Sequence, residues 1–384
     1  MIPYGRQRIS AADIDAVVEA LQSPLITQGP RVAAFEQAIA DYCHAPYGVA
    51  LSSATAALHV ACLTLNVGPG DLVWTVPNTF VASANCARYC GAEVDFVDID
   101  PTTGNLCVQA LAAKLAHAQH TGRLPKVIIP VHFAGASCDM QAIAALTKPL
   151  GIFIIEDASH AIGGRYQNLP VGACTYSDFT VFSFHPVKII TTGEGGVLTT
   201  RNQALAERAQ ELRSHGITRD PKRMEAKHPE PWYYEQRELG FNYRMTDIQA
   251  ALGLSQLSQL DTFVATRNEL ASQYRKAFSN TKVAFLQLSE QVYSSYHLFV
   301  IQVPAAQRLQ LFNDLRAANI GVHVHYIPVH WQPDFRPLGF ARGQFPQSEL
   351  YYNQAITLPL YVDLSASEQE HIIQTLLALA KHWE

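Results

Sequence analysis

The fold class is decided by Gly151-Ile152-Phe153-Ile154-Ile155-Glu156-Asp157 and, a little later, by Phe179-Thr180-Val181-Phe182-Ser183-Phe184. Each stretch is a short apolar run of strand length, and helical patterns separate such runs up to about residue 200. Strands that alternate with helices predict an α/β protein with a mostly parallel, buried sheet. The other strand candidates are Tyr47–Leu51, Leu72–Val76, Glu93–Val97, Lys126–His132 and Gly196–Thr199, and helix candidates include Thr55–Leu65, Cys138–Pro149 and Gln203–His215.

Two chemically distinctive side chains follow these strands. Asp157 ends the first stretch, and Lys188 comes just after the second, before a glycine-rich run that ends at Gly196. Ligands of such sheets bind at the carboxyl ends of the strands, so we expect both side chains at one edge. A lysine in apolar, glycine-rich surroundings is partly desolvated, which lowers its pKa and frees the neutral amine as a nucleophile. A carboxylate nearby suits a pyridine cofactor, because it keeps the ring nitrogen protonated.

Both residues also have simpler interpretations. The stem of Lys188 could pack while its ammonium group reaches solvent, and Asp157 could cap a helix. A third feature, Ser52-Ser53-Ala54-Thr55-Ala56-Ala57-Leu58, lies between a strand and an apolar helix. Small residues and hydroxyls at a helix N-terminus can bind phosphate, although serine and threonine also cap helices routinely. Neither G-x-x-x-x-G-K-[ST] nor G-x-G-x-x-G occurs, which argues against mononucleotide P-loop and NAD-dependent dehydrogenase functions.

Composition narrows the class of protein. The chain has 384 residues, 48% of them hydrophobic and 16% charged, which excludes global disorder and allows two or three domains. A net charge of −5 without charge blocks argues against nucleic acid or a membrane surface as partner. Residues 42–70 lack charged side chains, but their polar residues favour a strand, a turn and a buried helix over a membrane span. The absence of a basic-then-apolar leader and the odd count of seven cysteines favour a cytoplasmic location.

The organisation changes after about residue 216. Ile217–Glu238 is charged and proline-containing, which predicts a long loop, and Thr246 is expected to cap a helix over Thr246–Gln259 with Gln249 as its capping-box partner. The rest predicts a smaller α/β domain, so we divide the chain into residues 1–255 and 256–384. Its expected elements are a strand at His297–Val303, a helix at Ala306–Ala318, a strand at Val322–Tyr326 and a helix from near Ser367.

Taken in order, these features resemble one family along nearly the whole chain. The phosphate turn, the aspartate and the lysine resemble fold-type-I pyridoxal-phosphate enzymes, and within them the sequence is similar to the DegT/DnrJ/EryC1/StrS sugar-nucleotide aminotransferases. The resemblance implies a large domain with a mostly parallel, mixed seven-stranded sheet and a smaller C-terminal α/β domain. The matching segments are Leu25–Pro30, Thr79–Asn85, Glu156–Gly163, Ser183–Lys188, Gly240–Met245 and Val324–Pro328.

The resemblance also implies roles for single residues. Lys188 matches the lysine that binds the cofactor covalently, Asp157 the acid at the pyridinium nitrogen, and His160 a residue near the phenolic oxygen. Phe80 matches the aromatic that stacks on the ring, and Asn242 an asparagine that reaches the phosphate of a neighbouring subunit, which implies a homodimer with shared active sites. The remaining matches form the phosphate set Ala54, Thr55 and Ser183 and the nucleotide-sugar set Tyr4, Arg6, Leu25, Ile26, Thr27, Gln28, His185, His325 and Tyr326.

Some of these residues have other interpretations, and those are kept open. Phe80 could belong to the core, and Asn242 could cap the helix that follows it. The histidines His323, His325 and His330 could form a zinc site, because a His-x-His pair on a strand places both rings on one face. No acidic residue interleaves with them, so we expect no metal.

The implied reaction moves an amino group from L-glutamate to C4 of a UDP-linked 4-keto-6-deoxy-2-acetamido hexose, as in pseudaminic acid biosynthesis. The retained Lys188 favours amino transfer, since sugar 3-dehydratases of the family carry histidine at that position. Two alternatives remain open. One is C4 amination of another nucleotide-linked keto sugar, of the bacillosamine or perosamine type, and the other is a nucleotide-sugar-binding relative without turnover.

Overall fold

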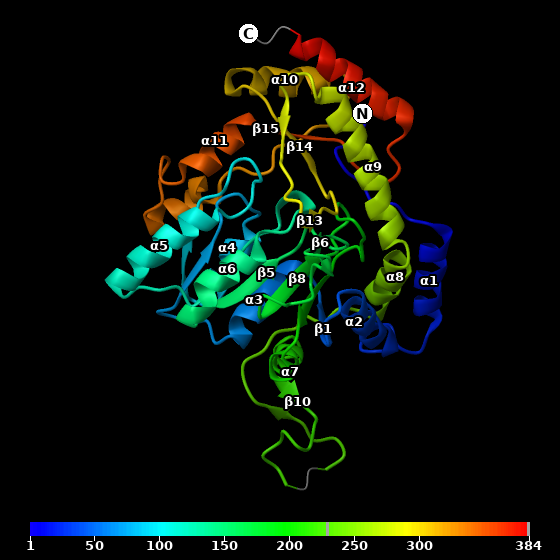
Figure 1. Cartoon of the computed structure of the whole chain (residues 1–384). Coiled ribbons are helices and arrows are strands. Elements are labelled where there is room, and N and C mark those ends of the chain that lie inside the picture. Colours follow the sequence, from blue (N-terminus) through cyan, green and yellow to red (C-terminus); the bar gives the residue numbers. More distant parts are fainter. Residues whose placement is uncertain (228–229, 382–384) are drawn as a thin grey trace.

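The computed structural model describes residues 1–227 and 230–381 (Figure 1). Its centre is a seven-stranded sheet with helices packed around it, which confirms the predicted α/β fold class. The strands lie in the order β1 (Tyr47–Leu51), β9 (Gly196–Thr200), β8 (Phe179–Ser183), β5 (Phe153–Asp157), β4 (Val127–Ile128), β2 (Leu72–Thr75) and β3 (Glu93–Phe96).

Strand directions determine which residues meet at one edge of this sheet. Pairing is parallel from β3 through β2, β4 and β5 to β8, whereas β9 is antiparallel to both β8 and β1. The carboxyl ends of six strands therefore lie at one edge, where β9 begins. Gly196, the first residue of β9, pairs there with Ser183 and with Leu51.

Both faces of the sheet are buried. Alternate residues of one strand enter different hydrophobic clusters: Ile155 packs with α3 and α4, and Ile154 with α5 and α6. Because side chains alternate across a strand, burial on both sides requires continuous apolar runs, which is the pattern in the sequence. The helices are α1 (Ala11–Gln22), α2 (Pro30–Tyr42), α3 (Ala54–Thr64), α4 (Ala82–Tyr89), α5 (Val108–Thr121), α6 (Met140–Thr147), α7 (Gln203–Leu212) and α8 (Asp247–Leu257).

The uncharged segment 42–70 forms β1, a turn and the buried α3, as predicted. Among residues 1–227 and 230–381, no helix has the length and apolar character needed to cross a membrane. The predicted loop Ile217–Glu238 extends away from the body of the molecule (Figure 1), with a short strand pair, β10 (Ile217–Thr218) and β11 (Glu235–Gln236), at its base. Residues 228 and 229 of that predicted loop lie outside the described residues.

The C-terminal part has its own small sheet and its own hydrophobic cluster, which includes Tyr274, Ile301, Leu315, Ile356 and Ile372. The division at residues 255 and 256 stays a prediction. The elements are α9 (Leu260–Phe278), β12 (Ala284–Phe285), β14 (Phe299–Gln302), α10 (Ala305–Ala317), α11 (Pro346–Gln354), β15 (Ala355–Leu358) and α12 (Ala366–Ala380); β13 (Val292–Tyr293) instead pairs with the hairpin of β6 (Arg165–Tyr166) and β7 (Leu169–Pro170).

The predicted strand Val322–Tyr326 is wrong. Only His323 pairs with the small sheet, through two backbone hydrogen bonds with Thr357. The chain then leaves the sheet edge, and the Tyr326 backbone N–H donates to Asn78 Oδ1 at 3.2 Å. A contact with a distant loop thus takes the place of further pairing with the small sheet. The alternating pattern of the sequence could not reveal that contact.

Replacing Thr246 by alanine should lower the free energy of unfolding by about 1 kcal/mol, since an N-cap hydroxyl contributes about that much. The predicted capping box is present: Thr246 Oγ1 accepts from the Gln249 N–H at 3.2 Å, and Gln249 Oε1 accepts from the Thr246 N–H at 2.9 Å. Urea unfolding would measure the loss, with the exposed Thr262→Ala in α9 as control. Equal losses of stability in Thr246→Ala and Thr262→Ala would contradict a stabilising N-cap at Thr246.

Candidate active site

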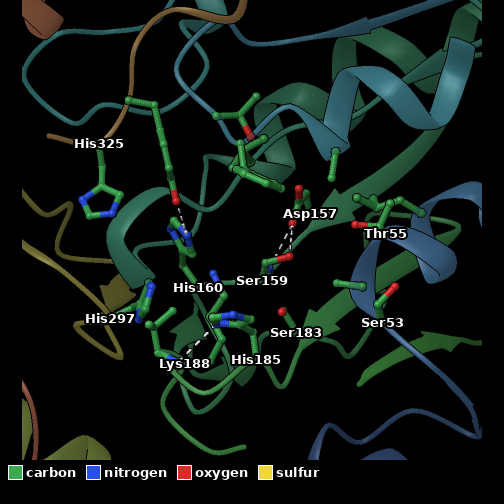
Figure 2. A pocket seen from close by; sticks show the side chains of 18 of the residues that line it. Ser53, Thr55, Asp157, Ser159, His160, Ser183, His185, Lys188, His297 and His325 are labelled. Carbon is green, nitrogen blue, oxygen red and sulfur yellow. Dashed lines mark hydrogen bonds between the residues drawn. The ribbon is translucent and has the colours of Figure 1, made fainter. Parts of the chain in front are cut away.

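A cavity of about 470 Å³ opens at the edge of the sheet where the six carboxyl ends meet (Figure 2). Eleven of the residues singled out from the sequence line it together. They come from β1–α3, the loop after β2, β5, β8 and the segments before α1 and after α10. They are Tyr4, Ala54, Thr55, Phe80, Asp157, His160, Ser183, His185, Lys188, His325 and Tyr326.

Lys188 follows the last strand residue, Ser183, by one turn of irregular chain, and its backbone N–H donates to the His185 carbonyl at 2.9 Å. The side chain keeps some accessible surface because it faces the cavity. Burial lowers the pKa of its amine to about 8, and the negative charge of Asp157 opposes part of that shift. About a tenth of the amine is therefore neutral at pH 7, far more than for a free lysine with a pKa of about 10.4, and the neutral form is the one that acts as nucleophile or proton carrier.

Three hydrogen bonds fix the carboxylate of Asp157. Oδ2 accepts from Ser83 Oγ at 2.6 Å, while Oδ1 accepts from the Ser159 hydroxyl at 2.6 Å and from its backbone N–H at 3.1 Å. Thr79 extends the network, because its hydroxyl lies 2.7 Å from Ser83 Oγ. The carboxylate is thus held in one orientation at the end of β5, where it lines the cavity.

The amino end of α3 offers donors for an anion. Ser53 caps the helix and accepts from the Ala56 N–H at 3.1 Å, which leaves the N–H groups of Ala54 and Thr55 without a partner inside the helix. Ser183 and the Thr55 side chain line the same wall. Partial positive charge at a helix N-terminus favours a phosphate-like group.

Gly196 lets β9 approach this helix end closely. A Cβ on Gly196 would lie 2.6 Å from the backbone nitrogen of Ala54 and 2.6 Å from the carbonyl carbon of Ser53. Both contacts are with backbone, so the helix end would have to move. Glycine is required at this position by the contact itself.

Gly196→Ala should therefore lower the free energy of unfolding of the cofactor-free protein by about 1–3 kcal/mol, the usual cost of overpacking. Gly68→Ala is the matched control, because nothing lies within 4 Å of a Cβ there. Chemical denaturation of both variants would test the prediction, and equal stability of the two would contradict it.

The far wall of the cavity is rich in imidazoles. His160 Nδ1 accepts from the Ala134 N–H at 3.3 Å, and His160 Nε2 lies 3.1 Å from the Tyr326 hydroxyl. His325, joined to Tyr326 by a cis peptide bond, has Nδ1 2.8 Å from Thr357 Oγ1. Burial, His323 and Lys188 lower the pKa of His325 to about 3, so its ring is neutral at physiological pH.

Phe80 is not a core residue. Its side chain is 60% exposed and lines the cavity, where it is free to cover a flat ring. The interpretation of Phe80 as ordinary core is therefore wrong.

Other predicted site residues lie outside the cavity wall of this chain. Arg6 is an exposed side chain 3.9 Å from Asp363, and Asn242 is exposed beside Ser214, with which it forms an isolated bridge. The segment 25–28 is an exposed loop tied to the start of α8 by the pairing of Thr27 with Thr246. Their roles in binding stay predictions.

Sequence reasoning missed several residues of the cavity wall. His297 was predicted only as the first residue of a strand, whereas β14 begins at Phe299, and Glu194 was noted only as part of a glycine-rich run. Nothing local marks His297 as functional, because the fold brings it to the cavity from a distant part of the chain, whereas Glu194 lies in the same segment as Lys188. Other lining residues lie in segments that the sequence singled out or marked as strand but received no individual role: Ser53, Leu58, Thr79, Ala82, Val131, Ser159 and Val187.

The three histidines weighed as metal ligands do not gather at one point. The rings of His323 and His325 are 4.6 Å apart, whereas His330 Nε2 lies 2.9 Å from Glu349 Oε1. Within the part of the chain that the structure describes, no group of three potential ligands could hold a metal ion.

Comparison with known proteins places these features in a family. The DegT/DnrJ/EryC1/StrS aminotransferase family matches residues 7–377. UDP-4-amino-4,6-dideoxy-N-acetyl-beta-L-altrosamine transaminase of Campylobacter jejuni is 36% identical over 384 residues, covering 99% of this chain and 97% of the relative. Among solved structures, the PLP-form of Spr1654 from Streptococcus pneumoniae is 31% identical with a TM-score of 0.90, covering 99% and 98% of the two chains. Helicobacter pylori PseC, described as an aminotransferase involved in the biosynthesis of pseudoaminic acid, is 29% identical with a TM-score of 0.89 over 100% of both chains.

The mixed sheet with a lysine and an oriented carboxylate at its carboxyl edge defines a fold-type-I transferase that depends on pyridoxal phosphate. The chain belongs to the DegT/DnrJ/EryC1/StrS aminotransferase family. It is a pyridoxal-phosphate-dependent sugar aminotransferase.

The residues present fit this cofactor. The close approach of Gly196 to the end of α3 leaves a donor-rich corner for a phosphate, and the fixed Asp157 carboxylate suits a protonated ring nitrogen. The Lys188 amine lines the same cavity, with a pKa low enough to react with an aldehyde.

Proposed function

We propose that this enzyme moves the amino group of L-glutamate to C4 of UDP-2-acetamido-2,6-dideoxy-β-L-arabino-hexos-4-ulose, in pseudaminic acid or related surface-sugar biosynthesis. The observation that carries the proposal is a reactive Lys188 in one cavity with an oriented Asp157. Similarity over whole chains to the Campylobacter transaminase and to PseC supports the substrate.

Each part of the cavity wall has a role in this proposal. Pyridoxal phosphate, when bound, supplies an electron sink for a carbanion. Asp157 would hold the ring nitrogen, the end of α3 with Ser183 would hold the phosphate, and Phe80 would cover the ring. Lys188 would carry a proton to and from the reacting carbon, and its placement on one side would decide the C4 configuration.

The sugar end of the site is proposed to include Tyr4, His325 and Tyr326, which already line the cavity. Arg6, His185 and the exposed loop 25–28 would extend it toward the nucleotide. Because Asn242 is exposed and outside this chain's own cavity wall, we assign it to the site of a partner subunit in a homodimer.

A panel assay tests the substrate. The purified enzyme is incubated with L-glutamate and a series of UDP- and dTDP-linked 4-keto sugars, and products are identified by mass spectrometry. Selective amination of the UDP-linked acetamido sugar supports the proposal. Preference for a dTDP- or perosamine-type sugar would replace the substrate, and no amination of any sugar would favour the non-catalytic alternative.

Mixing two inactive variants tests the shared site. In a heterodimer of Lys188→Ala and Asn242→Ala, one of the two sites would combine an intact Lys188 with an intact Asn242. Random exchange of subunits should therefore restore about a quarter of the parent activity. Failure of the mixture to recover, with subunit exchange verified by native mass spectrometry, would place Asn242 outside a shared site.

The low pKa of Lys188 has a direct pH consequence. In cofactor-free protein, the rate of its acetylation by acetic anhydride should be half-maximal near pH 8, because only the neutral amine reacts and its pKa is about 8. A lysine in a free peptide titrates near pH 10.4. Since Asp157 stabilises the ammonium form, Asp157→Asn should move the midpoint further down. Peptide mass spectrometry would follow the reaction, and a midpoint at the free-peptide value would contradict burial as the cause.

A further inference from the structure

A strained turn lies directly behind His160. The 3₁₀ turn Phe133–Gly135 has left-handed backbone at Ala134, with φ of 58°, and at Gly135, with φ of 102°. A Cβ on Gly135 would lie 2.7 Å from the Tyr296 nitrogen and 2.9 Å from the His297 nitrogen. A non-glycine residue in the left-handed region persists where the surroundings hold it, and such residues cluster at functional sites.

This turn and the chain before β14 are bonded to each other and to His160. The Ser295 N–H donates to the Gly135 carbonyl at 3.0 Å, and the Leu298 N–H donates to the Ala134 carbonyl at 3.3 Å. The Ser295 hydroxyl donates to the backbone carbonyl of His160 at 3.0 Å. The two segments and the histidine therefore form one hydrogen-bonded unit.

A buried cation anchors the same unit. The guanidinium of Arg267, on α9, donates to the carbonyl oxygens of Tyr296, His297 and Leu360 at 2.9–3.3 Å. The side chain is 1% exposed, and these partners are carbonyls. This bond holds the backbone of His297, two residues before β14 begins.

The hydrogen bonds of His160 determine its tautomer. A backbone N–H only donates, so the Ala134 N–H at 3.3 Å requires a lone pair on His160 Nδ1. The proton of a neutral ring is then on Nε2, which lies 3.1 Å from the Tyr326 hydroxyl oxygen. The ring of His297 packs against the ring of His160, with centroids 4.4 Å apart, and restricts its rotation.

We propose that Ala134 and His297 are positioning residues that hold His160 as the neutral tautomer with its proton on Nε2, which leaves the Tyr326 hydroxyl to donate its hydrogen bond into the cavity. His160 is then a fixed donor and not a proton carrier. Tyr326 becomes a one-directional donor to an acceptor oxygen of whatever ligand fills the cavity.

The surroundings of His160 oppose a second proton. Protonation of Nδ1 would break the bond from Ala134 and set two donors against each other. Burial, Lys188 and His325 also hold the pKa of His160 well below the ordinary value. The ionisable groups that face the ring are Lys188, His297, His325 and Tyr326, while the charge of Asp157 acts on the Tyr326 hydroxyl. Burial, His160, Lys188, Arg267 and His325 likewise lower the pKa of His297.

Nitrogen NMR of the cofactor-bound enzyme, labelled with ¹⁵N at histidine, tests the tautomer directly. His160 is assigned by its loss in His160→Gln. We expect an unprotonated Nδ1 and a protonated Nε2, both unchanged between about pH 5 and 8, where a free histidine titrates. A proton on Nδ1, or a titration in this range, would overturn the proposal. The result does not depend on the sugar substrate, so it is separate from the panel assay.

Variants at position 297 test the positioning role. His297→Ala removes the ring that packs on His160 and should give a mixture of the two His160 tautomers, whereas His297→Phe keeps a ring and should restore the single form. The exposed His120→Gln is the control. An unchanged His160 spectrum in His297→Ala, or an equal change in His297→Phe, would remove His297 from this role.

The variant Tyr326→Phe tests whether the acceptor oxygen belongs to the cofactor or to the sugar. This part rests on the proposed function. If the oxygen belongs to the cofactor, the pH midpoint at which the visible absorbance of the bound cofactor changes should differ between the variant and the parent. If it belongs to the sugar, the absorbance should stay the same while KM for the sugar rises about 10-fold, as for one lost hydrogen bond. No change in either quantity would show that Tyr326 donates to neither.

Discussion

Lys188→Ala is expected to lower kcat by about 10⁴-fold or more, because it removes the nucleophile and proton carrier in one change. The structure provides no second amine in the described wall of the cavity that could replace it. The visible absorbance that depends on the bond between lysine and cofactor should disappear as well. Steady-state kinetics and an absorbance spectrum measure the two effects independently.

The exposed Lys276→Ala, on α9, is the matched control and should keep the parent rate. Lys188→Arg keeps a positive charge but should remain inactive, since guanidinium stays protonated. Parent-like turnover in Lys188→Ala would refute the assignment of Lys188. A variant that lacks this absorbance but still turns over would show that Lys188 bonds to the cofactor while another group carries the proton.

Asp157→Asn is expected to lower kcat by about 10²–10³-fold while the fold is kept, as for loss of one preorganised electrostatic contact in a reaction. The amide has the shape of the carboxylate and can still accept from Ser83 or Ser159 through its oxygen. It cannot supply the negative charge that a protonated ring nitrogen requires. The loss should therefore fall on kcat more than on the stability of the protein.

Circular dichroism and unfolding midpoints would establish that Asp157→Asn is folded, and the exposed Asp15→Asn on α1 is the control for an acid-to-amide change. Ser83→Ala gives a graded comparison, because it removes one of the three hydrogen bonds to the carboxylate, together with the contact between Ser83 and Thr79, and should reduce kcat by about 10-fold. Equal rates in Asp157→Asn and the parent would exclude Asp157 from the chemistry.

Local interactions made part of this protein readable from its sequence. The capping box of Thr246 and Gln249 spans three residues, so its geometry follows once a helix forms there. Apolar runs such as Phe179–Ser183 marked strands that are buried on both faces. The observed helices α3, α10 and α12 begin within one residue of the predicted starts, for the same reason.

The pairing of Lys188 with Asp157 was also predictable, since parallel strands bring their carboxyl ends to one edge. The apolar, glycine-rich surroundings also predicted the direction of the pKa shift of Lys188, but not its size. A pKa of about 8 for Lys188 results from desolvation by residues far apart in the sequence, and Asp157 moderates it only because the folded cavity brings the two together.

The sequence by itself determined the α/β architecture, because strand periodicity and helix capping act over a few neighbouring positions. The order of its motifs indicated the family and the two residues that we propose carry the chemistry. Tertiary structure alone decided that residues 322–326 leave the sheet edge, that Gly196 must lack a side chain, and that His297 packs against His160. Each of these facts is a contact between segments that are distant along the chain. Burial and close approach exist only after the chain has folded, so no local pattern encodes them.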